Sequence, residues 1–73
     1  LYKALDIHKD LPNDLHTTEI LHLLGSTYIE VSEYRKSIEY LERSLEIAEE
    51  LGYENGIGSN LSNMALSYSF LGE

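Results

Sequence analysis

His16, Glu19 and His22 stand three residues apart and are the side chains best suited to hold a metal ion. An isolated Glu-x-x-His pair occurs among the ligands of di-iron helix bundles, where several such pairs converge on the metal. This chain offers one pair, and it has no cysteine to add a thiolate ligand. Surface or groove histidines are the better explanation, so we predict neither a metal site nor another cofactor.

The carboxylates of the segment 34–51 do not have the pattern of a catalytic site. Acid–base catalysis needs groups of suitable pKa held within reach of one another in a cleft. The acidic residues here recur at the spacing of a solvated helix face: Glu39, Glu42, Glu46, Glu49 and Glu50. Three nearby glycines lack the Lys-Ser/Thr ending and the preceding strand of a phosphate loop: Gly52, Gly56 and Gly58. We therefore predict that the chain is not an enzyme.

The net charge of the chain argues against some classes of binding partner. Thirteen acidic residues against 5 basic ones give a net charge of −8, a surface that repels nucleic-acid phosphates and anionic lipid headgroups. No apolar run approaches the roughly 18 residues of a membrane span. The lack of cysteine suits a reducing compartment. These features predict a cytoplasmic chain without nucleic-acid or membrane partners.

The elements that must position these side chains are helices. The segment 34–51 carries one apolar stripe at helical spacing, and a second stripe of small or apolar residues runs beside it. The first stripe is Tyr34, Ile38, Leu41, Leu45 and Ala48, and the second is Tyr40, Ser44, Ile47 and Leu51. A helix with two such stripes is covered from two sides, as in a helical repeat array. We expect Ser32 to cap its start and Gly52 to end it in a left-handed conformation.

Three further segments complete the all-α prediction. A helix is expected from about Asp14 to Val31, after Pro12 and Asn13 as turn and cap residues. Its expected apolar face consists of Ile20, Leu21, Leu24, Tyr28 and Val31. The short loop around Ser32 makes this helix an antiparallel neighbour of the next one. Another helix is expected over 55–71, and residues 1–11 are expected to be the end of a preceding helix.

The chain repeats itself at a fixed interval. LHLLGSTY begins at Leu21 and LSNMALSY at Leu61, and 61 − 21 = 40. A fixed period of this length is typical of a solenoid, whose units stack on their neighbours. The 73 residues hold less than two such periods, whereas about three repeats are usually needed for stability. We therefore expect either a piece of a longer array or open ends covered by a second copy.

These residues resemble the tetratricopeptide repeats, whose first helix carries Trp-x-x-Leu-Gly-x-x-Tyr and whose second carries Ala-x-x-x-Phe. The matching residues are Leu21, Leu24, Gly25, Tyr28, Ser37 and Leu41, with Ser44 at a later small position; Leu61, Met64, Ala65 and Tyr68 repeat the first-helix pattern. The period of 40 rather than 34, the missing tryptophan and the Leu51-Gly52 stop are similar to the longer variety found in polarity scaffolds and bacterial regulators.

The resemblance implies an α-solenoid fragment of antiparallel helix hairpins. One complete hairpin would span 14–51, and 55–71 would be the first helix of the next unit. Small side chains are expected where paired helices approach most closely, as at Gly25, Ser37 and Ser44. Tyrosines at packing positions are read as core residues, whereas Tyr2, Tyr40 and Tyr53 stay open.

The resemblance also implies a concave surface lined by the first helix of each unit. Carried over by position, its residues are Glu19, His22, Ser26, Ile29, Glu30, Ser59, Ser62, Asn63, Leu66 and Phe70. This mixture of polar and apolar groups suits a peptide or protein segment. Only Asn63 matches the family's carboxylate clamp, and Glu19 and Glu30 favour a neutral or basic ligand.

Two functions stay open at this point. The first is a non-enzymatic protein–protein interaction module that binds a segment on its concave face. The second is a structural or regulatory spacer that oligomerises or positions an output domain in a larger signalling protein. The pattern Leu61, Met64, Ala65 and Tyr68 lacks a partner helix on one side, so self-association of the fragment is expected.

Overall fold

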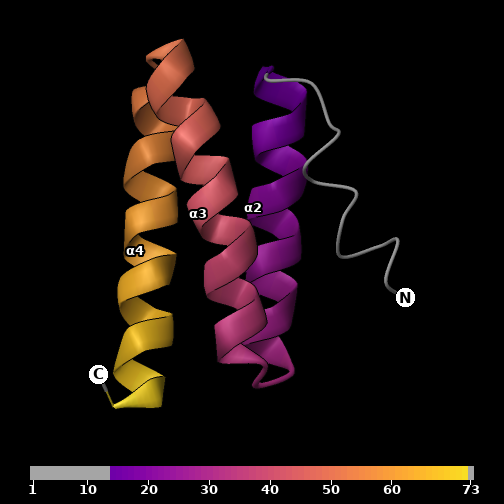
Figure 1. The fold of residues 1–73 in the computed structure, drawn as a ribbon, viewed down its shortest axis with the longest axis vertical. Helices are drawn as coiled ribbons and strands as arrows, with labels where there is room; N and C mark the ends of the chain where they lie inside the picture. Colours follow the sequence, from indigo (N-terminus) through magenta and orange to yellow (C-terminus); the bar gives the residue numbers. More distant parts are fainter. Residues whose placement is uncertain (1–13, 73) are drawn as a thin grey trace.

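The computed structural model of this chain describes residues 14–72, and these form three helices without a strand. They are α2 (Leu15–Glu30), α3 (Tyr34–Leu51) and α4 (Glu54–Leu71). Consecutive helices run in opposite directions and are joined by short turns (Figure 1). The all-α prediction is confirmed, and α4 begins one residue before the expected Asn55. The helix expected over residues 1–11, with Pro12 and Asn13, lies outside the described residues.

Asp14 begins α2 as its N-cap. Its carboxylate accepts a hydrogen bond of 2.8 Å from the backbone N–H of Thr17, one of the four amides that a helix start leaves without a partner. The backbone and side-chain hydrogen bonds with Thr17 lower the pKa of the Asp14 carboxyl. The helix therefore begins within one residue of the expected Asp14, and Asp14 itself is the cap.

Ser32 does not cap α3, contrary to the prediction. It has φ = 65° and ends α2 instead. Its N–H donates to Ile29 O at 3.0 Å, and the N–H of Glu33 donates to Tyr28 O at 2.8 Å, which is the Schellman pattern of a helix C-terminus. Glu33 follows directly and occupies the N-cap position of α3, so Ser32 forms the turn that reverses the chain. The left-handed stop expected at Gly52 is confirmed by its φ of 69°.

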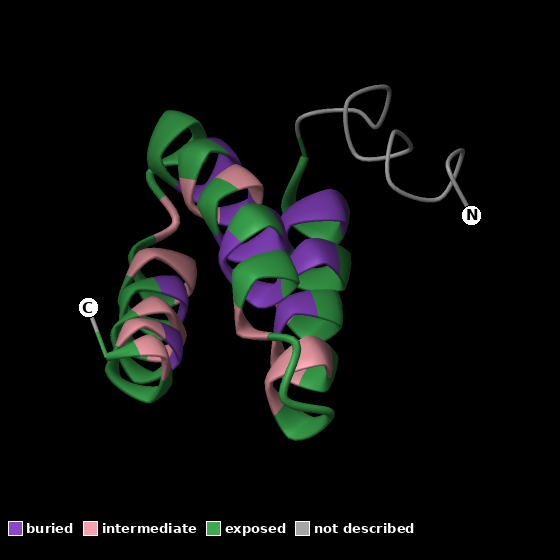
Figure 2. Ribbon diagram, turned by 60° about the horizontal axis from the view of Figure 1, so that its bottom comes forward, coloured by how far each residue is buried: buried purple, intermediate pink, exposed green. Residues whose placement is uncertain are grey.

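Helix α3 lies in the middle of the described structure and is buried on two faces. The buried residues of α2 and α4 turn towards it (Figure 2). The predicted stripes are confirmed at Ile38, Leu41, Ala48, Tyr40, Ser44 and Ile47, which are all buried. Leu51 is 46% exposed, because Ser44 already pairs with Thr18 near the start of α2 and the last turn of α3 extends past that helix. Burial raises the pKa of the Tyr40 hydroxyl, and Tyr28 stacks on its ring.

Helices α2 and α3 lie close together at Gly25. A Cβ placed there would lie 2.6 Å from Cδ2 of Leu41, a distance that real side chains do not reach. Ser37 and Ser44 are also fully buried, so the expectation of small residues at the contact is confirmed.

The apolar face predicted for α2 is only partly right. Leu21 is fully buried and Tyr28 half-buried, but Ile20, Leu24 and Val31 are exposed. The buried face is made instead by Thr17, Thr18, Leu21 and Gly25. This face carries small side chains, which allow α3 to pack closely. The hydroxyl of Thr18 on this face donates a hydrogen bond to the carbonyl of Ser44 in α3.

Candidate functional site

Helices α2 and α4 run in the same direction, with α3 packed against both (Figure 1). Side chains of α2 also contact α4 and the residue before it, along one line. Three side-chain hydrogen bonds cross this line. His22 Nδ1 lies 2.9 Å from Asn60 Oδ1, Asn63 Nδ2 donates to Ser26 Oγ at 3.0 Å, and the Tyr53 hydroxyl donates to Glu19 at 3.5 Å. We call this set of six residues the α2–α4 seam.

Beneath the seam lies a hydrogen-bonded network that joins all three helices. The hydroxyl of Thr18 donates to the backbone carbonyl of Ser44 at 2.6 Å, and the hydroxyl of Ser44 donates to the carbonyl of Thr18 at 2.6 Å. The side-chain amide of Asn60 donates to Ser44 Oγ at 2.9 Å. All three side chains are buried. Because a buried polar group without a partner is costly, this network fixes Asn60 from below and leaves its oxygen for His22.

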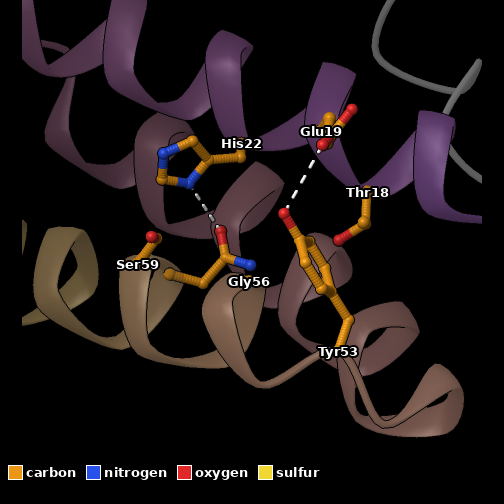
Figure 3. Close-up of a pocket in the computed structure, with 7 residues that line it drawn as sticks. Thr18, Glu19, His22, Tyr53, Gly56 and Ser59 are labelled. Atoms are coloured by element: carbon orange, nitrogen blue, oxygen red, sulfur yellow. Dashed lines mark hydrogen bonds between the residues drawn. The ribbon is translucent and has the colours of Figure 1, made fainter.

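A cavity of about 170 Å³ opens at one end of the seam (Figure 3). It is lined by Thr18, Glu19, His22, Tyr53, Gly56, Ser59 and Asn60. The ring of Tyr53 stands as one wall, with Glu19 above its hydroxyl and His22 on the other side (Figure 3). A Cβ at Gly56 would lie 2.5 Å from that ring, so glycine is what allows Tyr53 to pack in this position.

The structure brings some of the predicted surface residues together. Glu19, His22 and Ser59 line the cavity, and Ser26 and Asn63 bond to each other along the seam. Five others do not line the cavity: Ile29, Glu30, Ser62, Leu66 and Phe70. Phe70 stacks on Tyr34 of α3 with ring centroids 4.9 Å apart. Ligand binding by any of these residues remains a prediction.

Sequence reasoning missed Thr18, Tyr53, Gly56 and Asn60 as cavity residues. Gly56 and Tyr53 carried a signal, because a glycine three residues after an aromatic side chain at a helix start permits close packing of the ring. Asn60 carried a weaker one, since an amide that falls at a packing position must find hydrogen-bond partners. Thr18 gave no signal, because its role depends on the position of Ser44 in α3.

The chemical character of the cavity is acidic. Glu19 is the one carboxylate among its lining residues, and neither lysine nor arginine lines it. Within residues 14–72, no three His, Cys, Asp or Glu side chains come close enough to hold a metal ion together. None of the three described helices combines the length and apolarity needed to cross a membrane. The predicted cytoplasmic location stays a prediction.

Residues 1–50 match the family model of the tetratricopeptide repeat. The chain belongs to the tetratricopeptide repeat family. The antiparallel hairpin of α2 and α3, with Gly25 at a close contact, is the part of the described structure that corresponds to this repeat. Tetratricopeptide repeats are in general modules for protein–protein interaction. Searches of curated proteins and of solved structures returned no match.

Proposed function

We propose that the α2–α4 seam and its cavity bind a segment of another protein. The single observation that carries this proposal is the cavity itself, which lies between two helices and is lined by polar groups from both (Figure 3). Its volume of about 170 Å³ is below the roughly 300 Å³ at which small-molecule sites begin. A cavity of this size fits one side chain of a longer segment that continues along the surface.

The rest of the predicted concave surface supplies contacts of a second kind. Asn63 and Ser26 are half-buried and have further hydrogen-bonding capacity beyond their bond to each other. Leu66 and Phe70 expose 44% and 57% of their surface one and two turns farther along α4. We propose that a peptide lies along α4, with one side chain in the cavity and apolar side chains near Phe70.

We propose a non-catalytic role for this surface. The α3 carboxylates that the sequence placed on a solvated face are exposed. The cavity holds a single carboxylate, and its hydroxyls are largely engaged in hydrogen bonds between helices. Acid–base chemistry would require several free titratable groups within reach of one another, whereas binding a peptide does not.

Peptide selection with a matched pair of variants tests the proposal. Peptides would be selected from a random display library on the 73-residue chain, and their contacts mapped by amide chemical shifts. We expect shifts at Glu19, His22 and Ser59. Ser59→Arg, at an exposed position on the cavity rim, should weaken binding by roughly tenfold or more. Ser69→Arg makes the same change on the same helix outside the cavity and should leave affinity unchanged.

The proposal fails if selected peptides contact only the acidic face of α3. It also fails if the two arginine variants bind equally well while circular dichroism shows both to be helical. Helicity is the necessary control, since a loss of fold would weaken binding at any surface.

A second function is favoured by the outer face of α4, and here we propose self-association with a second copy. Leu61 is 50% exposed and Ala65 is exposed, whereas their counterparts Leu21 and Gly25 are buried against α3. This surface therefore matches one that accepts a helix of the α3 type. Because α3 is already buried on two faces within one chain, a second copy would supply that helix by exchange. Light scattering should give a mass above 8.3 kDa, and Leu61→Glu should return it to the monomer. A monomer at all concentrations would contradict self-association.

A further inference from the structure

We infer that the cavity takes an arginine side chain of the bound segment, and that Asn60 is the positioning residue that fixes the tautomer of His22 in the cavity lining. This inference rests on the proposed function and adds the chemistry of the partner to it. It follows from the direction of the hydrogen bonds beneath the seam, the wall formed by Tyr53 and the charge of Glu19.

The direction of the network begins at two backbone carbonyls, which can only accept. Ser44 Oγ gives its one hydrogen to the carbonyl of Thr18, and Thr18 Oγ1 gives its hydrogen to the carbonyl of Ser44. Ser44 Oγ has no second hydrogen, so it must accept from Asn60. The NH₂ group of Asn60 therefore faces Ser44, and its carbonyl oxygen faces His22.

The carbonyl oxygen of Asn60 then decides the tautomer of His22. An oxygen acceptor 2.9 Å from Nδ1 requires a hydrogen on that nitrogen. In neutral imidazole the other nitrogen, Nε2, is then an acceptor. Figure 3 shows Nδ1 turned to Asn60, and Nε2 on the edge of the ring that faces away from Tyr53 and Glu19. A chain of hydrogen bonds that begins at Ser44 thus fixes the tautomer of the neutral His22 ring, which lines the cavity.

The two groups on the Tyr53 side of the cavity suit a cationic donor. Glu19 is exposed and carries a carboxylate, whose only bond among the cavity residues is the long one of 3.5 Å from Tyr53. The half-buried ring of Tyr53 forms a flat wall beside it (Figure 3). A guanidinium group is planar, donates several hydrogen bonds and stacks on aromatic rings, whereas an ammonium group lacks the planar shape. The net charge of −8 adds long-range attraction for a basic segment.

The test compares arginine with its neutral isostere. The probes are N-acetyl-arginine methylamide and the matching citrulline compound, titrated into the ¹⁵N-labelled 73-residue chain. We expect the arginine probe to shift the amides of Glu19, Gly56 and Ser59, with the citrulline probe about threefold to tenfold weaker because it lacks the charge. A lysine probe should fall between them. Equal shifts from arginine and citrulline would overturn the inference.

Two carboxylate variants locate the charge that matters. Glu19→Gln removes the carboxylate in the cavity and should abolish the preference for arginine over citrulline. Glu42→Gln makes the same change on the exposed face of α3 and should leave the preference intact. If both variants lower the preference equally, the net charge of the chain and not the cavity selects arginine, and the inference is wrong.

The role of Asn60 has a direct spectroscopic test. Long-range ¹H–¹⁵N spectra of neutral His22 should show the hydrogen on Nδ1; finding it on Nε2 overturns this part of the inference without any variant. In Asn60→Leu, which removes both polar groups at similar volume, the hydrogen should move largely to Nε2 while helicity is retained. A role of Asn60 in stability alone would leave the tautomer unchanged.

These outcomes separate the inference from the proposed function. Library peptides that bind at the seam, and whose affinity does not change when each arginine is replaced by citrulline, would overturn the inference and leave the function standing. Library peptides that never contact the seam would overturn both.

Discussion

Helices α2 and α4 carry the same eight-residue pattern, yet they bury different faces. Leu21 of α2 is fully buried, whereas Leu61, at the matching position in α4, is 50% exposed. The reverse holds for Asn60, which is fully buried, and for its counterpart Ile20, which is 38% exposed. A shared pattern therefore does not fix which side of a helix becomes core.

The difference follows from where each helix meets α3. α2 packs on α3 through the face that contains Gly25, whereas α4 packs on the other side of α3 through the face that contains Asn60 and Ser67. Ser67 Oγ lies 3.0 Å from Ser37 Oγ in that contact. Each first helix of this repeat has two faces that suit a neighbour, and a face is buried where a neighbour is present. The outer face of α4 has no such neighbour among residues 14–72.

The difference between α2 and α4 should affect stability most when the matched leucines are truncated. Leu21→Ala should lower the free energy of unfolding by about 3 kcal/mol, because it removes a fully buried side chain from a core cluster. Leu61→Ala should cost less than about 1 kcal/mol, since that side chain is half exposed. Urea denaturation, with sucrose added if the first variant unfolds, measures both. Equal losses would mean that the two faces are equivalent in solution.

A matched enlargement should have the next largest effect. Gly25→Leu must force α2 and α3 apart, because even a Cβ at this position would lie 2.6 Å from Leu41, and it should cost about 2 kcal/mol. Ala65→Leu, at the matching exposed position, should change stability by less than about 0.5 kcal/mol. Thermal unfolding followed by circular dichroism compares them. A mild effect of Gly25→Leu would contradict the close approach of the two helices.

Exchanging the residues at the matched positions Ile20 and Asn60 should change stability less, and only the change in α4 should be costly. Asn60→Ile removes the amide that serves Ser44 and His22 and should cost about 1 to 2 kcal/mol. Ile20→Asn changes a position that is 38% exposed and should be close to neutral. Urea midpoints at constant slope measure both. A stabilising Asn60→Ile would show that the network serves positioning at the expense of stability.

The smallest effect is expected at the helix ends, where the two helices behave alike. Ser32 and Gly72 both have positive φ, at 65° and 80°. Ser32→Gly should stabilise the chain by about 0.5 kcal/mol. Glycine adopts this conformation without the strain of a Cβ, and this gain is larger than the cost of the greater conformational entropy that glycine gives the unfolded chain. Gly72→Ser should destabilise by a similar amount. Opposite signs from a single thermal-unfolding experiment would confirm the equivalence, and equal signs would contradict it.

Much of the fold could be predicted from the sequence because local signals agreed. The two stripes of α3 and its glycine stop were visible as spacing alone, and Gly25 was recognisable as a contact residue from its place in the pattern. Ser32 was misassigned because serine is a common N-cap and an uncommon left-handed residue. In the structure the short turn between α2 and α3 places Ser32 in the left-handed conformation.

The candidate site was predictable only in part. Glu19, His22 and Ser59 fall on the predicted surface, and helical periodicity is enough to place them there. The pairing of His22 with Asn60 joins residues 38 positions apart, and no local pattern encodes such a distance. The cavity depends on that pairing and on the ring of Tyr53, which packs over Gly56.

The sequence by itself determined that this chain is helical, where its helices run and that it repeats, since these properties depend on spacing and on local preferences. Tertiary structure decided which face of each repeated helix is buried and which polar groups point at one another. The physical reason is that burial and hydrogen-bond direction belong to pairs of elements. Ser44 can orient Asn60, and Asn60 can orient His22, only after three helices have come together.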